Sequence, residues 1–192
     1  VSLLVARAVD TAENFPECSA IYLDGVNYRW DIKPGHPDDV FEEKLGDEES
    51  RRFASERGIS MQRVFDGRAR FADRLRSLSP GVAEDSVNNL NGAMGAIEWW
   101  LEEPDVVEWL RFKAAAIEWH IASAYAGIKH HRPEVQVGGM WRQPAVAALS
   151  GYLPRRIRAH SGFQMPKEYW WAGGWAGLKG TVVNWVDTLV EW

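Results

Sequence analysis

The feature that most restricts the fold of this chain is a short apolar stretch between residues 19 and 31. Its apolar residues are Ile21, Tyr22, Leu23, Val26, Tyr28 and Trp30. Turn-forming residues at positions 33–37 end the stretch. A short apolar run closed by turns is typical of a strand buried on both faces, as in parallel sheets covered by helices. We therefore predict a strand over Ser19–Trp30 in a parallel sheet.

Helices and further strands alternate along the rest of the chain. Helices are predicted over residues 2–14, 38–45, 47–58, 60–78, 105–131, 143–150 and 181–191, the longest of them from apolar residues that recur every three or four positions. Strands are predicted over Val135–Trp141 and Ile157–Phe163. Such alternation is typical of βαβ units, in which the paired strands are parallel.

This order of elements predicts an α/β fold of the (β/α)8 barrel type, present only in part. A complete barrel takes about 250 residues, and this chain has 192. We therefore predict a single domain over residues 1–192 that forms the C-terminal two-thirds of a barrel and lacks its N-terminal strands. The first residue, Val1, also suggests a fragment or a processed product.

The charge pattern limits the partners that the chain is expected to bind. The formal net charge is −5, and no basic tract offsets it, so neither nucleic acid nor an anionic membrane is expected as a partner. Apolar runs are interrupted before the roughly 20 residues that a bilayer span needs. Arg7 and Asp10 interrupt the first apolar residues, so no signal peptide is expected. The compartment and the oligomeric state stay open.

Motifs that hold metals or cofactors are missing from the sequence. It contains no H-E-x-x-H, no C-x-x-C and no close group of His and Asp, so we predict no metal site. It also contains no G-x-S-x-G, no P-loop and no glycine fingerprint of dinucleotide-binding folds. We therefore expect no cofactor and no nucleophilic-serine chemistry.

Polar residues mark the end of the predicted strand. Asn27, Arg29 and Asp31 alternate with apolar residues, so in a strand they would project from the same side. In α/β barrels the carboxyl ends of the strands build the active site. These three side chains are therefore the first candidates for a functional site.

The segment Asp24–Asp31, DGVNYRWD, resembles the fourth-strand signature of chitinase-like glycoside hydrolases, D-G-x-D-x-D-x-E. Asp24, Gly25, Val26 and Trp30 fit this signature. The resemblance implies a (β/α)8 barrel that acts on carbohydrate. It also implies a catalytic acid at the last position of the motif.

The three acidic positions of that signature depart from it. Asn27 and Arg29 stand in place of the two aspartates, and Asp31 stands in place of the glutamate that protonates the leaving oxygen. The resemblance thus implies Asp31 as the acid, with Arg29 and Asn27 orienting the substrate. However, Arg29 cannot replace an orienting carboxylate, because it only donates hydrogen bonds. The chain is therefore either a glycosidase whose second acid lies elsewhere or a non-catalytic, glycan-binding or structural barrel.

Aromatic residues near other predicted strand ends are candidate sugar platforms. The chain has eleven tryptophans; Trp141 ends one predicted strand, and Trp170 and Trp171 follow the next. Aromatic faces pack well against the C–H faces of sugar rings. Glu168, in the same segment as Trp170, is a candidate second carboxylate.

Two further residues complete the candidate site. His160 falls near the end of the strand predicted over Ile157–Phe163, and Arg142 directly follows Trp141; both are predicted to contact the ligand. Arg142 also supports a third alternative, in which an unrelated α/β enzyme holds a small anionic substrate between Arg29 and Arg142.

Overall fold

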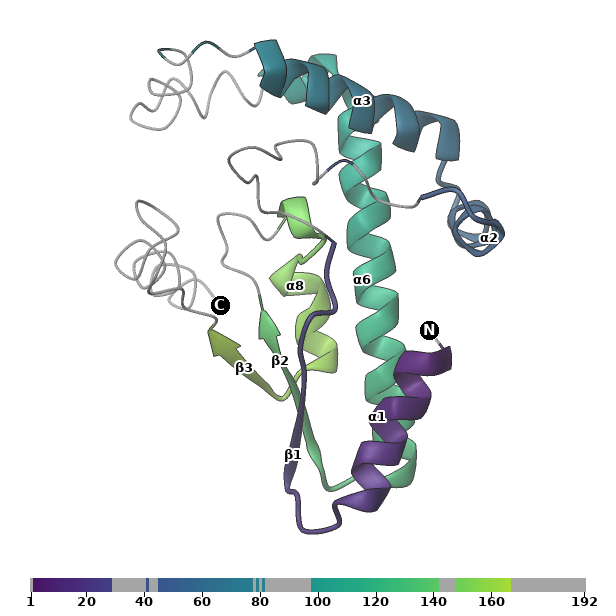
Figure 1. Ribbon diagram of the computed structural model, residues 1–192, viewed down its shortest axis with the longest axis vertical. Helices are drawn as coiled ribbons and strands as arrows, with labels where there is room; N and C mark the ends of the chain where they lie inside the picture. The colour runs from purple at the N-terminus through teal and green to yellow at the C-terminus, as the bar shows by residue number, and fades with distance from the viewer. Residues whose placement is uncertain are drawn as a thin grey trace. The chain divides into compact units, whose positions relative to one another are not determined.

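The computed structural model of the chain describes residues 2–28, 41, 45–77, 79, 81, 98–141 and 148–166 (Figure 1). The helices are α1 (Ser2–Asn14), α2 (Glu48–Glu56), α3 (Met61–Ser77), α6 (Pro104–His131) and α8 (Pro154–Ile157), followed by a 3₁₀ helix, η2 (Arg158–His160). The strands are β1 (Ala20–Leu23), β2 (Gln136–Trp141) and β3 (Phe163–Pro166). Within this described part, no helix has the length and apolar character needed to cross a membrane.

The three strands of the described residues form one parallel sheet in the order β1-β2-β3. Their parallel direction agrees with the prediction from the alternation of elements. The barrel prediction is wrong, because the described residues are mostly helical and hold a small three-stranded sheet, not a (β/α)8 barrel. Alternation of helices and strands predicts the direction of neighbouring strands but not their number, so it does not by itself distinguish an open sheet from a barrel.

The first strand is much shorter than predicted. β1 ends at Leu23, and Gly25 has a φ of +72°, which lies in the left-handed region that glycine tolerates. The backbone N–H of Asn27 then donates to the carbonyl of Gly25 at 2.9 Å, which closes a tight turn. Asn27 therefore lies beyond the end of β1. The prediction that Asn27, Arg29 and Asp31 project from the same side assumed that Asn27 is a strand residue, and this assumption is wrong.

The strand predicted over Ile157–Phe163 is also wrong. Pro154 begins α8, η2 continues it to His160, and β3 starts only at Phe163. Proline is well suited to the first turn of a helix, because its fixed φ matches the helix and its missing N–H would have no partner there. Ile157 is buried and belongs to this helix, not to a strand. The sequence could not show this, because a short apolar run is compatible with both a helix and a strand.

The longer predicted elements are confirmed. Helices predicted over 2–14, 60–78 and 105–131 correspond to α1, α3 and α6, and the strand predicted over Val135–Trp141 corresponds to β2. The helix predicted from Asp47 corresponds to α2: the Asp47 side chain accepts a hydrogen bond from the N–H of Ser50 at 2.7 Å. Residues 148–150 are helical, while the helices predicted over 38–45 and 181–191 lie largely or wholly outside the described residues.

The chain divides into two compact units: residues 1–30 and 113–192 form unit 1, and residues 31–112 form unit 2. In unit 1, α1 and the part of α6 from Lys113 onward pack with β1 and β2. Along β1, Ile21 and Leu23 are buried and Tyr22 is exposed, so one face of this strand points into the core. The buried core of unit 1 consists of Ala8, Ala12, Ile21, Leu23, Ile117, Ile121, Ala124, Ile128, Val135, Val137, Tyr152 and Ile157.

Arg132, directly after α6, connects the ends of α1 and α6 in unit 1. Its guanidinium donates to the carbonyl of Ala12 at 2.7 Å and to the carbonyl of Pro16 at 3.1 Å. The last carbonyls of a helix have no partner within the helix, so these bonds satisfy groups at the end of α1. The N–H of Gln136 then donates to the carbonyl of Ser19 at 2.9 Å, which begins the pairing of β1 with β2.

The core of unit 2 is aromatic. The ring of Trp109 on α6 lies 5.5 Å from that of Phe71 on α3 and 6.2 Å from that of Phe41, measured between centroids. Phe53 of α2 meets Phe112 of α6 edge to face at 5.8 Å. Tilted and edge-to-face arrangements of this kind are favourable for aromatic rings and add to the free energy gained by burial.

Candidate functional site

The carboxyl ends of the three strands meet at one edge of the sheet, here called the carboxyl edge. Leu23, the last residue of β1, pairs with Gly139, and Trp141, the last residue of β2, pairs with Pro166, the last of β3. Ligands of open parallel α/β sheets bind outside the carboxyl ends of the strands. The carboxyl edge is therefore the first place to look for a site.

Asn27 lies just beyond this edge, and its side chain stabilises the local backbone. It is half-buried, and its Nδ2 donates to the carbonyl of Tyr28 at 2.6 Å. Asn27 therefore shapes the turn that follows β1, which is a different position from the strand end predicted for it.

Most of the other predicted site residues lie outside the described residues. This holds for Arg29, Asp31, Arg142, Glu168, Trp170 and Trp171. Trp141 is the last residue of β2, and its backbone is described. In the sequence, these residues follow the ends of β1, β2 and β3.

His160 does not lie where the sequence placed it. It belongs to η2, which precedes β3, and therefore lies toward the amino end of that strand rather than near a carboxyl end. Its ring lies 5.9 Å from that of Tyr125 on α6, at an interplanar angle of 60°. The ligand contact predicted for His160 depended on a strand that is not present.

Sequence reasoning missed a largely buried cluster in unit 1, here called the Lys113 cluster: Tyr28, Lys113, Ser150, Gly151 and Tyr152. Lys113, Ser150 and Tyr152 have no exposed surface. The Lys113 Nζ lies 5.1 Å from the centroid of the Tyr28 ring, and the N–H of Tyr28 donates to the carbonyl of Ser150 at 3.0 Å. Three segments that are distant in the sequence thus meet in this cluster: residue 28, α6 at Lys113, and the turn at residues 150–152.

A signal for Lys113 was present in the sequence. Lys113 lies four positions after Trp109 and four before Ile117, and both of these are buried on α6. Lys113 therefore occupies a position in the apolar stripe of this helix. A charged residue in such a position indicates that a buried partner compensates its charge. For Lys113, one such partner is the ring of Tyr28.

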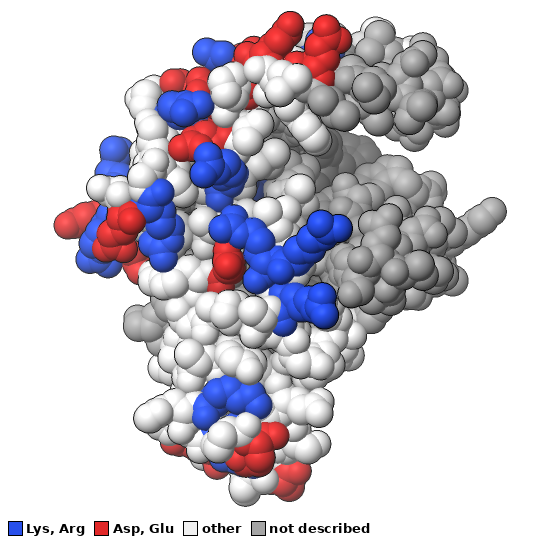
Figure 2. All heavy atoms as spheres, turned by 180° about the vertical axis from the view of Figure 1, so that it is seen from behind, with Lys and Arg blue, Asp and Glu red and all other residues white. Residues whose placement is uncertain are grey.

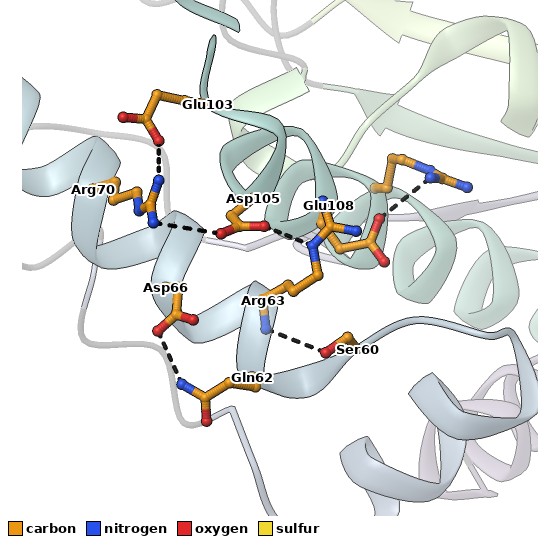
Figure 3. Close-up of polar contacts among 9 residues, drawn as sticks. Ser60, Gln62, Arg63, Asp66, Arg70, Glu103, Asp105 and Glu108 are labelled. Carbon is orange, nitrogen blue, oxygen red and sulfur yellow. Dashed lines mark hydrogen bonds and ion pairs between the residues drawn. The ribbon is translucent and has the colours of Figure 1, made fainter. Parts of the chain in front are cut away.

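A second charged cluster, in unit 2, joins α3 to the start of α6 (Figure 3). Arg63 pairs with Asp105 at 2.6 Å, and Arg70 pairs with Glu103 at 2.5 Å and with Asp105 at 3.8 Å. Hydrogen bonding to Asp105 raises the pKa of Arg63, and hydrogen bonding to Glu103 raises the pKa of Arg70. Each carboxylate here faces a guanidinium, so the cluster stabilises the helix pair instead of offering a site.

The described residues show no arrangement that would hold a metal. No group of three or more His, Cys, Asp and Glu side chains comes together among them. Figure 2 shows acidic and basic groups interspersed over much of the described surface on the face that it draws. The expected absence of a nucleic-acid partner stays a prediction.

Comparisons with known proteins do not assign the chain to a family. No protein-family model matches it, and neither the curated proteins nor the solved structures contain a match. Any function proposed for the chain therefore rests on its own residues and geometry.

Proposed function

We propose that the chain binds carbohydrate at the carboxyl edge of its sheet and acts on it as a glycoside hydrolase-like domain. The observation that supports this most is the common edge of β1, β2 and β3. Each strand is followed in the sequence by residues whose chemistry suits a sugar ligand. The proposal does not require a barrel, because an open parallel sheet also presents its strand ends at one edge.

The roles assigned to these residues follow from their chemistry. Asp31, after β1, is the proposed acid, and Glu168, after β3, is the proposed second carboxylate. Hydrolysis of a glycosidic bond generally needs two carboxyl groups, about 5–10 Å apart. Arg29 and Arg142 would donate hydrogen bonds to hydroxyl or acetamido oxygens, as arginine has five N–H donors and no acceptor.

The tryptophans supply the apolar part of this proposal. Trp141, Trp170 and Trp171 would pack against the C–H faces of the sugar rings. Tryptophan combines a large apolar surface with a polar N–H, so it suits ligands that are apolar on one face and polar at the rim.

A second function is glycan binding without cleavage. Arg29 favours it, because it stands where the resembled signature has a carboxylate. A guanidinium next to Asp31 favours the ionised form of that carboxylate, whereas an acid catalyst must be protonated. Binding would then use the same arginines and tryptophans, and Asp31 would accept hydrogen bonds from sugar hydroxyl groups.

The first experiment is a titration of tryptophan fluorescence with chito- and gluco-oligosaccharides. A saturable shift is expected, and Trp170→Ala with Trp171→Ala should weaken binding by roughly tenfold or more. Trp100→Ala is the matched control, because Trp100 is 44% exposed in unit 2 and should leave the titration unchanged. A flat response across the panel would contradict carbohydrate binding altogether.

The second experiment separates hydrolysis from binding alone. Asp31→Asn and Glu168→Gln should each lower the rate of oligosaccharide hydrolysis by about 10²- to 10⁴-fold, the usual contribution of a general acid or base. Glu17→Gln is the control, since Glu17 is exposed in the loop before the amino end of β1. Saturable binding without any hydrolysis would favour the non-catalytic function.

A further inference from the structure

Lys113 is a fully buried lysine on α6, at the point where the part of this helix that belongs to unit 1 begins. Lysine is among the residues least often buried, because transferring an ammonium out of water is costly unless other groups compensate. A methionine of similar length would occupy the same space without that cost. The position of Lys113 in the apolar stripe of α6 therefore calls for a reason that packing alone does not provide.

The ring of Tyr28 is one group that compensates the charge. The Lys113 Nζ lies 5.1 Å from the ring centroid, within the distance at which a cation is attracted to an aromatic face. This attraction is strongest where water is excluded, and the lysine has no exposed surface. Lys113 therefore restrains the side chain of Tyr28.

The backbone of Tyr28 is held as well. Its N–H donates to the carbonyl of Ser150 at 3.0 Å, and Ser150 is fully buried. Tyr28 is thus fixed by its ring to α6 and by its amide to the turn at residues 148–152. It follows closely on Leu23, where β1 ends at the carboxyl edge.

Gly151 allows the turn to approach α6 closely. A Cβ at this position would lie 2.9 Å from the carbonyl oxygen of Lys113 and 2.7 Å from Cγ1 of Ile117, and its φ of +87° favours glycine. The turn that accepts the Tyr28 hydrogen bond is therefore pressed against the same turn of helix that bears Lys113. The Tyr28 side chain, the turn at residues 148–152 and α6 are therefore packed against one another.

We propose that Lys113 is a positioning residue: its ammonium fixes Tyr28 and thereby the orientation of the segment Asp24–Tyr28 as it leaves the carboxyl edge. This segment contains Asn27 and directly precedes Arg29. The role in ligand binding rests on the proposed carbohydrate function, whereas the restraint on Tyr28 is a property of the free protein and is tested separately.

The restraint is tested by amide hydrogen exchange at residue 28, followed by NMR of the uniformly ¹⁵N-labelled full chain. Lys113→Met should speed the exchange of the Tyr28 amide by about 3- to 30-fold, the range expected from loss of a desolvated cation–aromatic contact. Exchange at Val137, in β2, should not change. Lys113→Arg, which keeps the cation, should stay within about threefold of the wild type.

Lys129→Met provides a matched control on the same helix. The Lys129 Nζ lies 5.8 Å from the centroid of the Tyr125 ring and donates to the carbonyl of Pro133 at 2.8 Å. It therefore makes a similar ring contact, but toward the other end of α6. Lys129→Met should leave both the exchange at Tyr28 and the binding of oligosaccharide unchanged.

The same variants test the effect on the ligand. Lys113→Met should raise the oligosaccharide Kd by about tenfold, and Lys113→Arg should restore most of the affinity. Tyr28→Leu should have an effect of similar size. Because Lys113 acts through Tyr28, the double variant should lose no more affinity than either single variant, and simple additivity would contradict the proposal.

Each outcome has a definite meaning. If Lys113→Met folds and its residue-28 amide exchanges at the wild-type rate, the proposed restraint on Tyr28 is wrong. If Lys113→Met does not fold, Tyr28→Leu replaces it, and an unchanged exchange rate at residue 28 of that variant contradicts the restraint equally. Faster exchange with an unchanged Kd overturns the role in binding. If the wild type binds no oligosaccharide, the carbohydrate proposal fails, and the exchange data still decide whether Lys113 fixes Tyr28.

Discussion

In unit 1 the buried side chains are mostly small or aliphatic, such as Ala12, Ile121 and Val137, whereas in unit 2 the largest ones are aromatic, such as Trp109 and Phe112. The small residues of unit 1 let helices and strands approach closely. In unit 2 a few large rings fill the space between α2, α3 and the start of α6. The first kind of core distributes its stability over many contacts, and the second concentrates it in a few side chains.

The two units also differ in how they accommodate charge. In unit 2, Arg63 and Arg70 pair with carboxylates at the edge of the helix pair (Figure 3). In unit 1, the Lys113 ammonium is buried against the Tyr28 ring. Paired surface charges fasten elements that packing already brings together, whereas a buried cation restrains a specific neighbour. This difference is why we propose a positioning role for Lys113 in unit 1 and assign a structural role to the arginines of unit 2.

The largest expected effect comes from removing the main ring of unit 2. Trp109→Ala should lower the free energy of unfolding by about 4 kcal/mol, because the side chain is fully buried and a large cavity would remain. Ile121→Ala in unit 1 should cost less, roughly 3 kcal/mol. Urea denaturation followed by circular dichroism measures both. The contrast between concentrated and distributed cores would break down if Ile121→Ala proved the more damaging change.

Next in size is a clash between two helices. A Cβ at Gly67 on α3 would overlap the backbone carbonyl of Asp105, so Gly67→Ala should destabilise unit 2 by about 2 kcal/mol even though alanine favours helices. Gly127→Ala in unit 1 should cost less, since its nearest neighbour is a side-chain atom, Cγ1 of Val5 at 2.8 Å. Thermal denaturation of both variants tests this order, with Gly81→Ala as a control because no atom of the described residues lies within 4 Å of a Cβ placed there.

Helix capping differs between the units and gives a pH-dependent effect. Hydrogen bonding from Ser50 lowers the pKa of Asp47 below its usual 3.8. A folded-state pKa below the unfolded one means that the cap stabilises the protein above about pH 4 and is lost as the pH falls through the folded value. Asp47→Ala should cost about 1 kcal/mol at pH 7, and Asp47→Asn should keep the cap while removing its acid sensitivity. In contrast, Leu153 before α8 makes no side-chain cap. Equal acid sensitivity of wild type and Asp47→Asn would contradict this interpretation.

The long elements can be predicted from the sequence because their signal is repeated many times. Over α6, buried Val106, Ile117, Ile121 and Ile128 recur at helical spacing, and no strand pattern competes. β2 is predictable because it follows a clear helix end at Arg132-Pro133. Short segments carry too few repeats for this, so the run at Ile157 suggests a strand although Pro154 begins a helix there.

The site is less predictable because it depends on contacts between distant segments. Gly25 ends β1 through a turn that local alternation of apolar residues does not reveal. The Lys113 cluster joins residues 28, 113 and 150, and no local pattern links these positions. Within the sequence, the lysine in the apolar stripe is the one sign of it. The first miss concerns local turn geometry and the second concerns tertiary contacts, and the periodicity of apolar residues encodes neither.

The smallest expected effects concern exposed ion pairs, and they test whether the charges of unit 2 are structural. The Arg63–Asp105 pair links α3 to α6 at 2.6 Å with Asp105 only 17% exposed, whereas Arg156 and Glu118 in unit 1 pair at 2.8 Å with Glu118 more open to solvent. Arg63→Gln should therefore lower the urea midpoint slightly, and Arg156→Gln should lower it less, because exposed pairs contribute little to stability. Raising the salt concentration to about 1 M should reduce both effects, the second to near zero, because exposed charges are screened more strongly than partly buried ones. If Arg156→Gln were the costlier change, ion pairs would stabilise unit 1 at least as much as unit 2. The stability data would then no longer distinguish the charges of unit 2 as the structural ones.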